Sequence, residues 1–302
     1  MAIEINEKYN FLRNIRESND QTKLFWIVED IYERKQVCLK GLVNAKDAEE
    51  EFKIMKTLDH RNILKVFEGF SFSNEDIRYF AITMEFMTAG DLGSFIERKA
   101  ENPENWAENQ ALQIICQFVN GISYIHSKEI LHRDIKPSNV FIGERMRVVV
   151  GDFDDEAVAS GMTTTNLLEI VGTEYYLPPE VINRNKGDQL TFARDIWAMG
   201  VVIYQTAYLT HPFLDKNEEH IKTLFNIYEA NQHEPETIFS RCQDLIDVCL
   251  RKDQLQRVEN ASLLAKNARI SGLIEQLEFG VDQETLEYSE EAVDVVRRIN
   301  QH

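Results

Sequence analysis

The feature that most constrains the fold of this chain is a change in its hydrophobic pattern near Gly90. Before this point, short runs rich in β-branched and aromatic residues predict strands at Leu24–Val28, Gln36–Lys40 and Tyr79–Phe86. The charged segment Ala45–Leu58 between them has its apolar residues at helical spacing. We therefore expect the first part of the chain to form mainly strands, together with one helix.

After Gly90 the pattern is that of helices. Between Trp106 and His126 the apolar residues recur close to the 3.6-residue period, at Leu112, Ile115, Val119, Ile122 and Ile125. Arg147–Val150 interrupts this pattern as a short strand, and long helical stretches return from Thr191 onward. A stripe of this kind indicates a buried helix face, and by itself it does not indicate a function.

These patterns predict an α+β fold with two lobes. We expect a small β-rich N-terminal lobe with one main helix over residues 1–87, a larger and mostly helical lobe over 88–278, and a helical C-terminal tail over 279–302. Within the tail, Glu284–Ile299 is predicted to form an amphipathic helix. The prolines are scattered and there is no low-complexity tract, so the sequence indicates no linker.

The charge balance argues against some classes of partner. Of the 302 residues, 28% are charged, and the formal net charge at pH 7 is −18. Nucleic acids and anionic membranes both attract surfaces rich in lysine and arginine. We therefore expect neither nucleic acid nor membrane as a partner, and the acidic balance is interpreted as a matter of solubility.

The cysteines and the apolar stretches indicate the compartment. The four cysteines show no C-x-x-C spacing and no pairing with histidine, so we expect neither a disulfide framework nor a zinc site. The first residues, MAIEINEKYNF, lack the apolar run of a signal peptide. The longest apolar stretch, Ile196–Tyr204, is too short to cross a bilayer. A cytoplasmic or nuclear protein is expected, rather than a secreted one.

Polar residues with catalytic potential are concentrated in Ile130–Ile142, which reads ILHRDIKPSNVFI. This segment resembles the catalytic loop H-R-D-x-x-x-x-N of eukaryotic-type protein kinases. The resemblance implies that Asp134 accepts the proton of the attacking hydroxyl, Lys136 supports the transferred phosphate, and Asn139 binds magnesium. A lysine two residues after the aspartate is typical of the serine/threonine branch of the family.

Further segments that resemble kinase motifs lie on either side of this loop. Val37–Lys40 resembles the V-A-I-K strand, which implies that Lys40 binds the α- and β-phosphates of ATP. Glu51 matches the helix glutamate that pairs with this lysine. Asp152, in the sequence GDFD, matches the magnesium-binding aspartate of D-F-G. Each of these residues alone is a common surface charge, but their order along the chain indicates one site.

The segment Val171–Glu180, VGTEYYLPPE, resembles the end of a kinase activation segment, with P-P-E in place of A-P-E. In the family this glutamate is tied to an arginine in the large lobe, and Arg257 has the expected D-x-x-x-R spacing. Asp195 in DIWAMG resembles the buried aspartate that braces the catalytic loop. The resemblance runs from about Tyr9 to Leu273, and its details look closest to the NIMA-related serine/threonine kinases.

The resemblance also implies a pocket for the adenosine of ATP. The residues expected to surround it are Cys38, Met84, Glu85, Met87, Asp91 and Phe141. Cys38 and Phe141 would lie on the two faces of the adenine, and Met84 would lie at the back of its pocket. Glu85 and Met87 would bind the adenine through their backbone groups, and Asp91 would meet the ribose.

The chain departs from the kinase pattern at the loop that covers the phosphates. No glycine precedes Gly41, so the G-x-G-x-x-G motif is absent, and the corresponding segment Arg16–Thr22 reads RESNDQT. Glycine serves there because its missing Cβ lets backbone amides approach phosphate closely. Glu17 and Asp20 add negative charge, and Asp154 replaces the glycine of D-F-G. These changes are expected to weaken ATP binding without removing the phosphoryl-transfer residues.

The resemblance therefore implies a protein serine/threonine kinase that uses ATP and Mg²⁺ and acts on a protein with a serine or threonine acceptor. The missing glycines leave a second interpretation open, a pseudokinase scaffold with weak or no ATP turnover. A small-molecule phosphotransferase of related fold is disfavoured, because the activation segment ends in the full Pro178–Glu180 motif.

Regulation is expected at the residue before the catalytic aspartate. Kinases with an arginine at this position, here Arg133, usually need a negative charge in the activation segment. One hypothesis is that Glu169 supplies a weaker, built-in anion. The alternative is phosphorylation of a threonine by an upstream kinase, and the candidates are Thr163, Thr164, Thr165 and Thr173.

Overall fold

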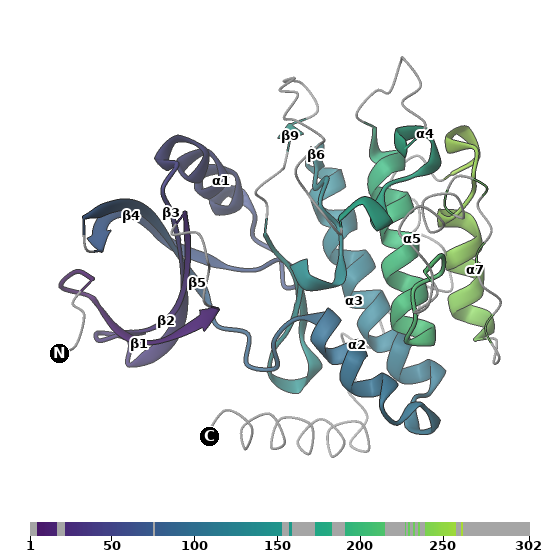
Figure 1. Cartoon of the computed structure of the whole chain (residues 1–302), viewed down its shortest axis with the longest axis horizontal. Helices are drawn as coiled ribbons and strands as arrows, with labels where there is room; N and C mark the ends of the chain where they lie inside the picture. Colours follow the sequence, from purple (N-terminus) through teal and green to yellow (C-terminus); the bar gives the residue numbers. More distant parts are fainter. Residues whose placement is uncertain are drawn as a thin grey trace.

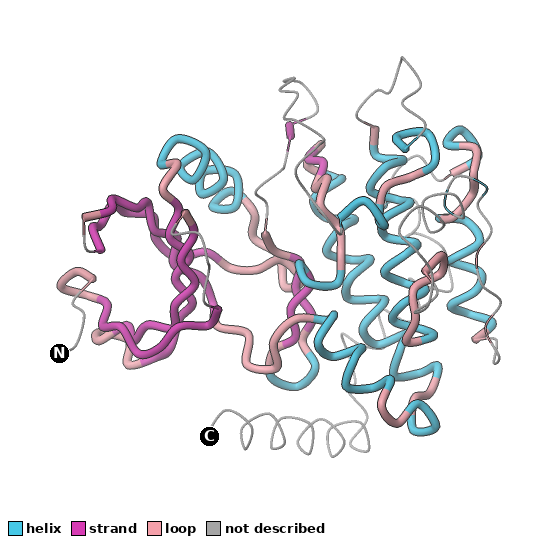
Figure 2. The backbone as a smooth tube through the Cα atoms, in the orientation of Figure 1, coloured by secondary structure: helices cyan, strands magenta, loops and turns pink. Residues whose placement is uncertain are grey.

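The described part of the computed structural model comprises residues 5–16, 22–74, 76–152, 157–158, 173–182, 191–214, 227, 229, 232, 235, 239–257 and 261. These residues form one body of strands with a single helix and a second body made mainly of helices (Figures 1 and 2). The predicted α+β fold with two lobes is thus confirmed. The residue boundaries assigned to the lobes stay a prediction, and the C-terminal tail lies outside the described residues.

The strands and helices follow in this order. The strands are β1 (Tyr9–Arg16), β2 (Lys23–Asp30), β3 (Lys35–Leu42), β4 (Val66–Asn74), β5 (Ile77–Glu85), β6 (Ile130–Leu131), β7 (Val140–Ile142), β8 (Val148–Val150) and β9 (Ala157–Val158). The helices are α1 (Ala45–Thr57), α2 (Leu92–Ala100), α3 (Glu108–Ser127), α4 (Pro179–Ile182), α5 (Phe192–Tyr208) and α7 (Ser240–Cys249). Short 3-10 turns lie at Pro103–Asn105, Pro137–Asn139, Glu144–Met146, Thr173–Tyr176 and Gln254–Gln256.

The small lobe is built on one antiparallel sheet with the order β1-β2-β3-β5-β4. Successive side chains of a strand point to opposite faces of the sheet, so its apolar residues lie on both faces and both faces must be covered. One face is covered by its own cluster, which includes Trp26, Leu39 and Tyr79. On the other face α1 packs against β4 and β5 (Figure 1).

Helix α1 confirms the predicted helix but ends one residue earlier than expected, because Leu58 is its C-cap and has extended backbone angles. The buried residues within the helix are Ala48, Glu51 and Met55. Phe52 of the same helix is only partly buried, against Phe80. The face of α1 that enters the core therefore includes a carboxylate, and this carboxylate belongs to the site described below.

The large lobe is organised around α3 and α5, which lie side by side and pack together, with α7 against α5 (Figure 1). These helices approach closely at a small residue: a Cβ on Gly200 of α5 would lie 2.6 Å from the Cβ of Cys249 on α7. Such a distance is well inside van der Waals contact, so α5 and α7 require glycine at this position.

The segment that precedes β4 is tied directly to the large lobe. Asn62 Nδ2 donates to the carbonyl of Val148 at 2.8 Å, and the amide of Val150 donates to Asn62 O at 2.9 Å. Leu64 N donates in turn to Val150 O at 2.8 Å. A single apolar core also runs through both lobes, with Ile82 on one side and Ile122 on the other. The two lobes are therefore joined by packing and hydrogen bonds as well as by the chain.

Among the residues that the structure describes, no helix combines the length and the apolar character needed to span a membrane.

Candidate active site

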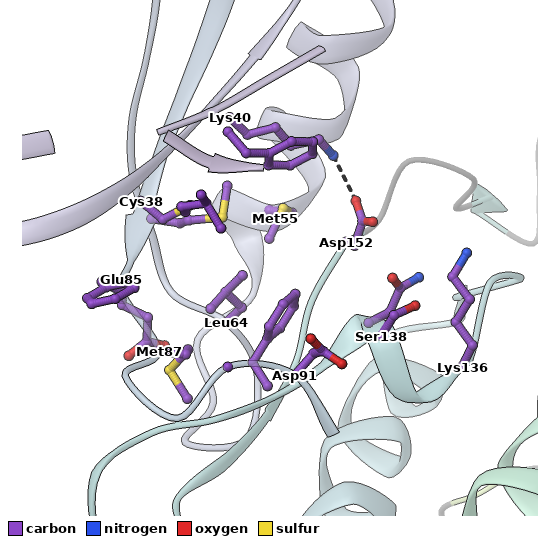
Figure 3. A pocket seen from close by; sticks show the side chains of 17 residues that line it. Cys38, Lys40, Met55, Leu64, Glu85, Met87, Asp91, Lys136, Ser138 and Asp152 are labelled. Carbon is purple, nitrogen blue, oxygen red and sulfur yellow. Dashed lines mark hydrogen bonds and ion pairs between the residues drawn. The ribbon is translucent and has the colours of Figure 1, made fainter. Parts of the chain in front are cut away.

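A pocket of about 420 Å³ lies between the two lobes (Figure 3). Its lining comes from the sheet of the small lobe, the connection from β5 to α2, and the loops of the large lobe. The residues that line it are Ile15, Phe25, Cys38, Lys40, Met55, Leu64, Met84, Glu85, Phe86, Met87, Gly90, Asp91, Lys136, Ser138, Asn139, Phe141 and Asp152. Clefts between lobes that combine apolar walls with a few charged groups are typical ligand sites.

One end of the pocket holds a lysine between two carboxylates. Lys40 Nζ on β3 lies 2.9 Å and 3.1 Å from the two carboxylate oxygens of Glu51 on α1. The same nitrogen lies 2.8 Å from Asp152 Oδ1, just after β8 (Figure 3). Lys40 and Glu51 are 2% and 3% exposed. A buried lysine needs such partners to remain charged, and these three residues were predicted to act together.

The predicted catalytic residues meet in the loop between β6 and β7. Lys136 Nζ lies 2.7 Å from Asp134 Oδ2. Asn139 Nδ2 donates to the backbone oxygen of Asp134 at 2.8 Å and to its Oδ2 at 2.9 Å. The other carboxylate oxygen, Oδ1, is buried and has no hydrogen-bond partner among the described residues. Asp134 is therefore held in one orientation with one acceptor oxygen left for a ligand.

Asp195, at the start of α5, holds the backbone of this loop. Its carboxylate accepts the amides of His132 and Arg133 at 2.8 Å and 2.9 Å, and it lies 3.0 Å from His126 Nε2. Arg133 has φ of +66°, a conformation that non-glycine residues rarely adopt. Two amide bonds to one buried carboxylate stabilise this backbone, so the predicted bracing role of Asp195 agrees with the geometry.

The surroundings of Asp195 also favour the ionised form of its carboxyl group. Burial by itself would raise the pKa of this carboxyl group. The hydrogen bond from His126 is the largest of the effects that oppose burial, and together with the hydrogen bond from the amide of His132 it holds the pKa below its ordinary value. Ala261 N donates to His126 Nδ1 at 3.1 Å, so the proton on Nε2 is directed at Asp195.

The residues predicted to bind magnesium fit a hard cation. Asn139 uses its amide nitrogen on Asp134, which leaves its side-chain oxygen, and Asp152 contacts Lys40 through Oδ1. Both residues line the pocket, and Gly151 N donates to Asn139 O at 3.0 Å. No cluster of three metal-ligating side chains occurs in the described ranges. This donor set suits Mg²⁺, which usually takes one or two protein oxygens and completes its shell with phosphates and water.

The residues predicted to surround the adenosine all line the pocket. Figure 3 shows Glu85 and Met87 at the end opposite Asp152 and Lys136, with Leu64 between them. Burial raises the pKa of the Cys38 thiol to about 12, and the charge of Lys40 opposes this only in part. The thiol is thus neutral and serves as an apolar contact.

Asp91 has a structural role that the sequence did not reveal. It is the N-cap of α2: Oδ1 accepts the amide of Ser94 and Oδ2 accepts the hydroxyl of Ser94, each at 2.9 Å. Both oxygens are thus used within the protein, although each retains a lone pair. Contact with a ribose stays a prediction, and it would be shared with the capping of α2.

Several pocket residues were not predicted from the sequence. Ile15 on β1 and Phe25 on β2 belong to the small-lobe sheet, and Phe25 is the cross-strand partner of Lys40. Met55 on α1 and Leu64, just before β4, also line the pocket. Ile15 and Phe25 stand on either side of the glycine-free segment Arg16–Thr22, which was a signal for a place in the pocket. An apolar residue in a strand is, however, equally well explained by the core.

The last part of the activation segment, from Thr173 to Glu180, lies among the described residues. Arg257 is buried and holds Glu180 through two hydrogen bonds, Nη1 to Oε1 at 2.6 Å and Nη2 to Oε2 at 2.8 Å, as predicted. Thr173 begins a 3-10 turn. The remaining predicted control residues, Thr163, Thr164, Thr165 and Glu169, lie outside the described residues, as does Asp154.

Comparisons with known proteins agree with this geometry. A model of the protein kinase domain matches residues 18–267. Aurora kinase of Dictyostelium discoideum is 33% identical over 208 residues, which are 69% of this chain and 50% of that protein. Serine/threonine-protein kinase Nek5 of Mus musculus is 30% identical over 250 residues, which are 80% of this chain and 37% of that protein.

A plant relative extends the same similarity. Serine/threonine-protein kinase TOUSLED of Arabidopsis thaliana is 32% identical over 225 residues, which are 70% of this chain and 31% of that protein. The chain thus spans about a third to a half of the length of these three relatives.

Proposed function

The chain belongs to the protein kinase domain family, and from this premise we propose that it transfers the γ-phosphate of ATP to a serine or threonine hydroxyl of another protein. Its similarity to Nek5, Aurora kinase and TOUSLED confirms the predicted membership among the serine/threonine kinases. The chain covers only part of the length of these relatives, so its substrate protein belongs to the proposal. We also propose that it acts in the cytoplasm or the nucleus.

The proposal rests above all on the free carboxylate oxygen of Asp134. Lys136 and Asn139 hold the other oxygen, and Oδ1 is buried without a partner among the described residues. This is the arrangement required of a general base that receives the proton of a substrate hydroxyl. The hydroxyl oxygen forms a bond to the γ-phosphorus, the bond from that phosphorus to the ADP oxygen breaks, and the proton passes to Asp134.

The remaining residues position the reactants. Lys40, held by Glu51 of α1, presents its charge to the α- and β-phosphates, and Lys136 supports the transferred phosphoryl group. Asn139 and Asp152 would hold Mg²⁺, which when bound neutralises phosphate charge. The protein thereby contributes mainly orientation and electrostatic stabilisation, which dominate phosphoryl transfer.

The proposal is tested by replacing the base. We expect Asp134→Asn to lower kcat by about 10² to 10⁴-fold, the usual contribution of a general base, and to leave the affinity for magnesium-ATP nearly unchanged. The measurements are ATP turnover with a generic protein substrate and calorimetric titration of nucleotide. Undiminished activity of the purified variant would contradict the assignment of the base.

The pseudokinase interpretation rests on the absence of the glycine motif in Arg16–Thr22. It predicts weak or no ATP turnover by the folded parent protein, and little or no further loss in Asp134→Asn. The same two measurements therefore decide between the kinase and the scaffold, since only the kinase shows a large difference between parent and variant.

A further inference from the structure

An arginine outside the pocket joins three segments behind its adenosine end. Arg147 lies between the turn Glu144–Met146 and strand β8 of the large lobe. Its Nη1 donates to Glu85 Oε2 at 2.5 Å and its Nη2 donates to Glu85 Oε1 at 3.1 Å. Its Nε donates to the backbone oxygen of Arg61 at 3.0 Å. The planar guanidinium thus uses three donors on two segments and holds both against the large lobe.

Through Glu85, the contacts of Arg147 restrain the connection from β5 to α2. It is the last residue of β5 and lines the pocket. Its Oε1 also accepts the amide of Lys65 at 2.8 Å, and its own amide donates to Lys65 O at 2.9 Å. Both carboxylate oxygens and the amide of Glu85 are therefore engaged outside the nucleotide site, so the position of its backbone depends on Arg147 and Lys65.

The backbone near Arg147 suggests that this geometry serves function. The two preceding residues, Arg145 and Met146, both have positive φ, +54° and +56°. Consecutive non-glycine residues in this region are costly, and such strain is found where a specific geometry is needed. The side chains of Arg147 and Glu85 are 38% and 19% exposed, and partly exposed ion pairs contribute little to overall stability. Stability alone is thus a weak reason for this turn.

We infer that Arg147 is a positioning residue for nucleotide binding: through its ion pair with Glu85 it fixes the end of β5, and with it the adenosine end of the pocket, against the large lobe. The inference rests on the proposed function, since it concerns the affinity for ATP. Arg147 does not line the pocket, so it acts through Glu85 and contacts no substrate.

The test is nucleotide affinity in a matched pair of variants. We expect Arg147→Gln to bind a non-hydrolysable ATP analogue about two- to fivefold more weakly at low salt, the range expected of a partly exposed ion pair. The loss should shrink at high salt because the pair is screened. Arg147→Lys should fall between variant and parent, since lysine keeps the charge but not the two parallel hydrogen bonds. In turnover assays KM should rise more than kcat falls.

Arg145→Gln is the matched control. It removes the same charge two residues earlier in the same turn, where Arg145 is exposed and does not line the pocket. Its affinity should equal that of the parent. Glu85→Gln should reproduce the loss, and the double variant with Arg147→Gln should lose no more than either single variant. Thermal midpoints confirm folding, and Arg147→Lys carries the test if Arg147→Gln does not fold.

The outcomes are distinguishable. Equal affinities of Arg147→Gln and parent, or an equal loss in Arg145→Gln, would overturn the positioning role while leaving the kinase proposal intact. Losses that add in the double variant would show that Arg147 and Glu85 act separately, and they too would overturn it. A folded parent that binds no nucleotide would contradict the proposed function, and this inference with it.

Discussion

At the scale of single residues, the buried charges of the site are neutralised by other side chains rather than by water. Lys40 is 2% exposed and has two carboxylate partners, of which Glu51 is as deeply buried as the lysine. Asp152, the other partner, has a side chain that is 31% exposed. Removing the lysine therefore leaves Glu51 as an unpaired buried charge, whereas Asp152 can still be hydrated.

We expect Lys40→Met to lower the free energy of unfolding by about 3 kcal/mol, mainly because Glu51 loses its counter-charge. Lys40→Met combined with Glu51→Gln should recover part of this loss, since the buried charge is then removed. Urea unfolding of both proteins at neutral pH measures the difference. A double variant no more stable than Lys40→Met would show that the loss comes from packing instead.

Asp195 makes the stability of the catalytic loop depend on pH. Its pKa is held below the ordinary value of 3.8, so its contribution is fully present well above this pH and is lost as the pH falls through the folded-state pKa. We expect Asp195→Asn to cost about 3 kcal/mol at neutral pH, the scale of bonds to a buried charge. The difference from the parent should shrink below about pH 4. A pH-independent difference in urea unfolding would contradict the role of charge.

At the scale of elements, the catalytic loop is positioned by helices distant from it in sequence. Asp195 on α5 fixes the amides of His132 and Arg133, and Gly121 on α3 allows Asn62 to approach. A Cβ on Gly121 would lie 2.6 Å from the backbone oxygen of Asn62, which accepts the amide of Val150. Asp195 of α5 thus holds the backbone of the loop between β6 and β7, and the close approach of Asn62 to Gly121 places β8 beside α3.

The activation segment carries the regulatory hypothesis. We expect Glu169→Gln to lower kcat of fully dephosphorylated protein by about tenfold, because a charge-assisted contact with an arginine such as Arg133 is about twice as strong as a neutral one. Phosphate turnover of matched, phosphatase-treated proteins measures this. If the dephosphorylated parent is inactive, or if Glu169→Gln changes nothing, the threonines Thr163, Thr164 and Thr165 become the leading switch.

At the scale of the whole molecule, the two lobes share one apolar core. Ile82 and Met84 of the small lobe belong to the same buried cluster as Ile122 and Val150 of the large lobe. Among its described residues, the small lobe has a second cluster on the outer face of its sheet. A lobe that buries one of its faces against the other lobe gains much of its stability from that contact.

We therefore expect the lobes to unfold together. Hydrogen-exchange pulse labelling along a urea titration reports on β3 and on α5 separately in the unmodified protein. Both elements should lose protection at the same urea concentration, because neither lobe keeps its core without the other. Earlier loss of protection in β3 would show that the small lobe is an independent unit.

The sequence by itself determined the parts of the site that lie close together along the chain. Asp134, Lys136 and Asn139 fall within six residues, and the structure brings them into contact as predicted. Three of the strands before Gly90, β2, β3 and β5, and the long helix α3 after it also follow from hydrophobic period, which is a local property, whereas β1 and β4 were not predicted. The pairing of Lys40 with Glu51 was predicted as well, because each residue stands in a motif of its own, whereas the contact of Lys40 with Asp152 was not predicted.

Only the tertiary structure revealed residues that stand in no motif. Phe25 lines the pocket because β2 pairs with β3, although a phenylalanine in a strand is equally typical of a core. Arg147 meets Glu85 across 62 positions in sequence, and as a single arginine it has no pattern to distinguish it. Contacts of this kind depend on how the lobes pack, and spacing along a chain determines distance only within one element.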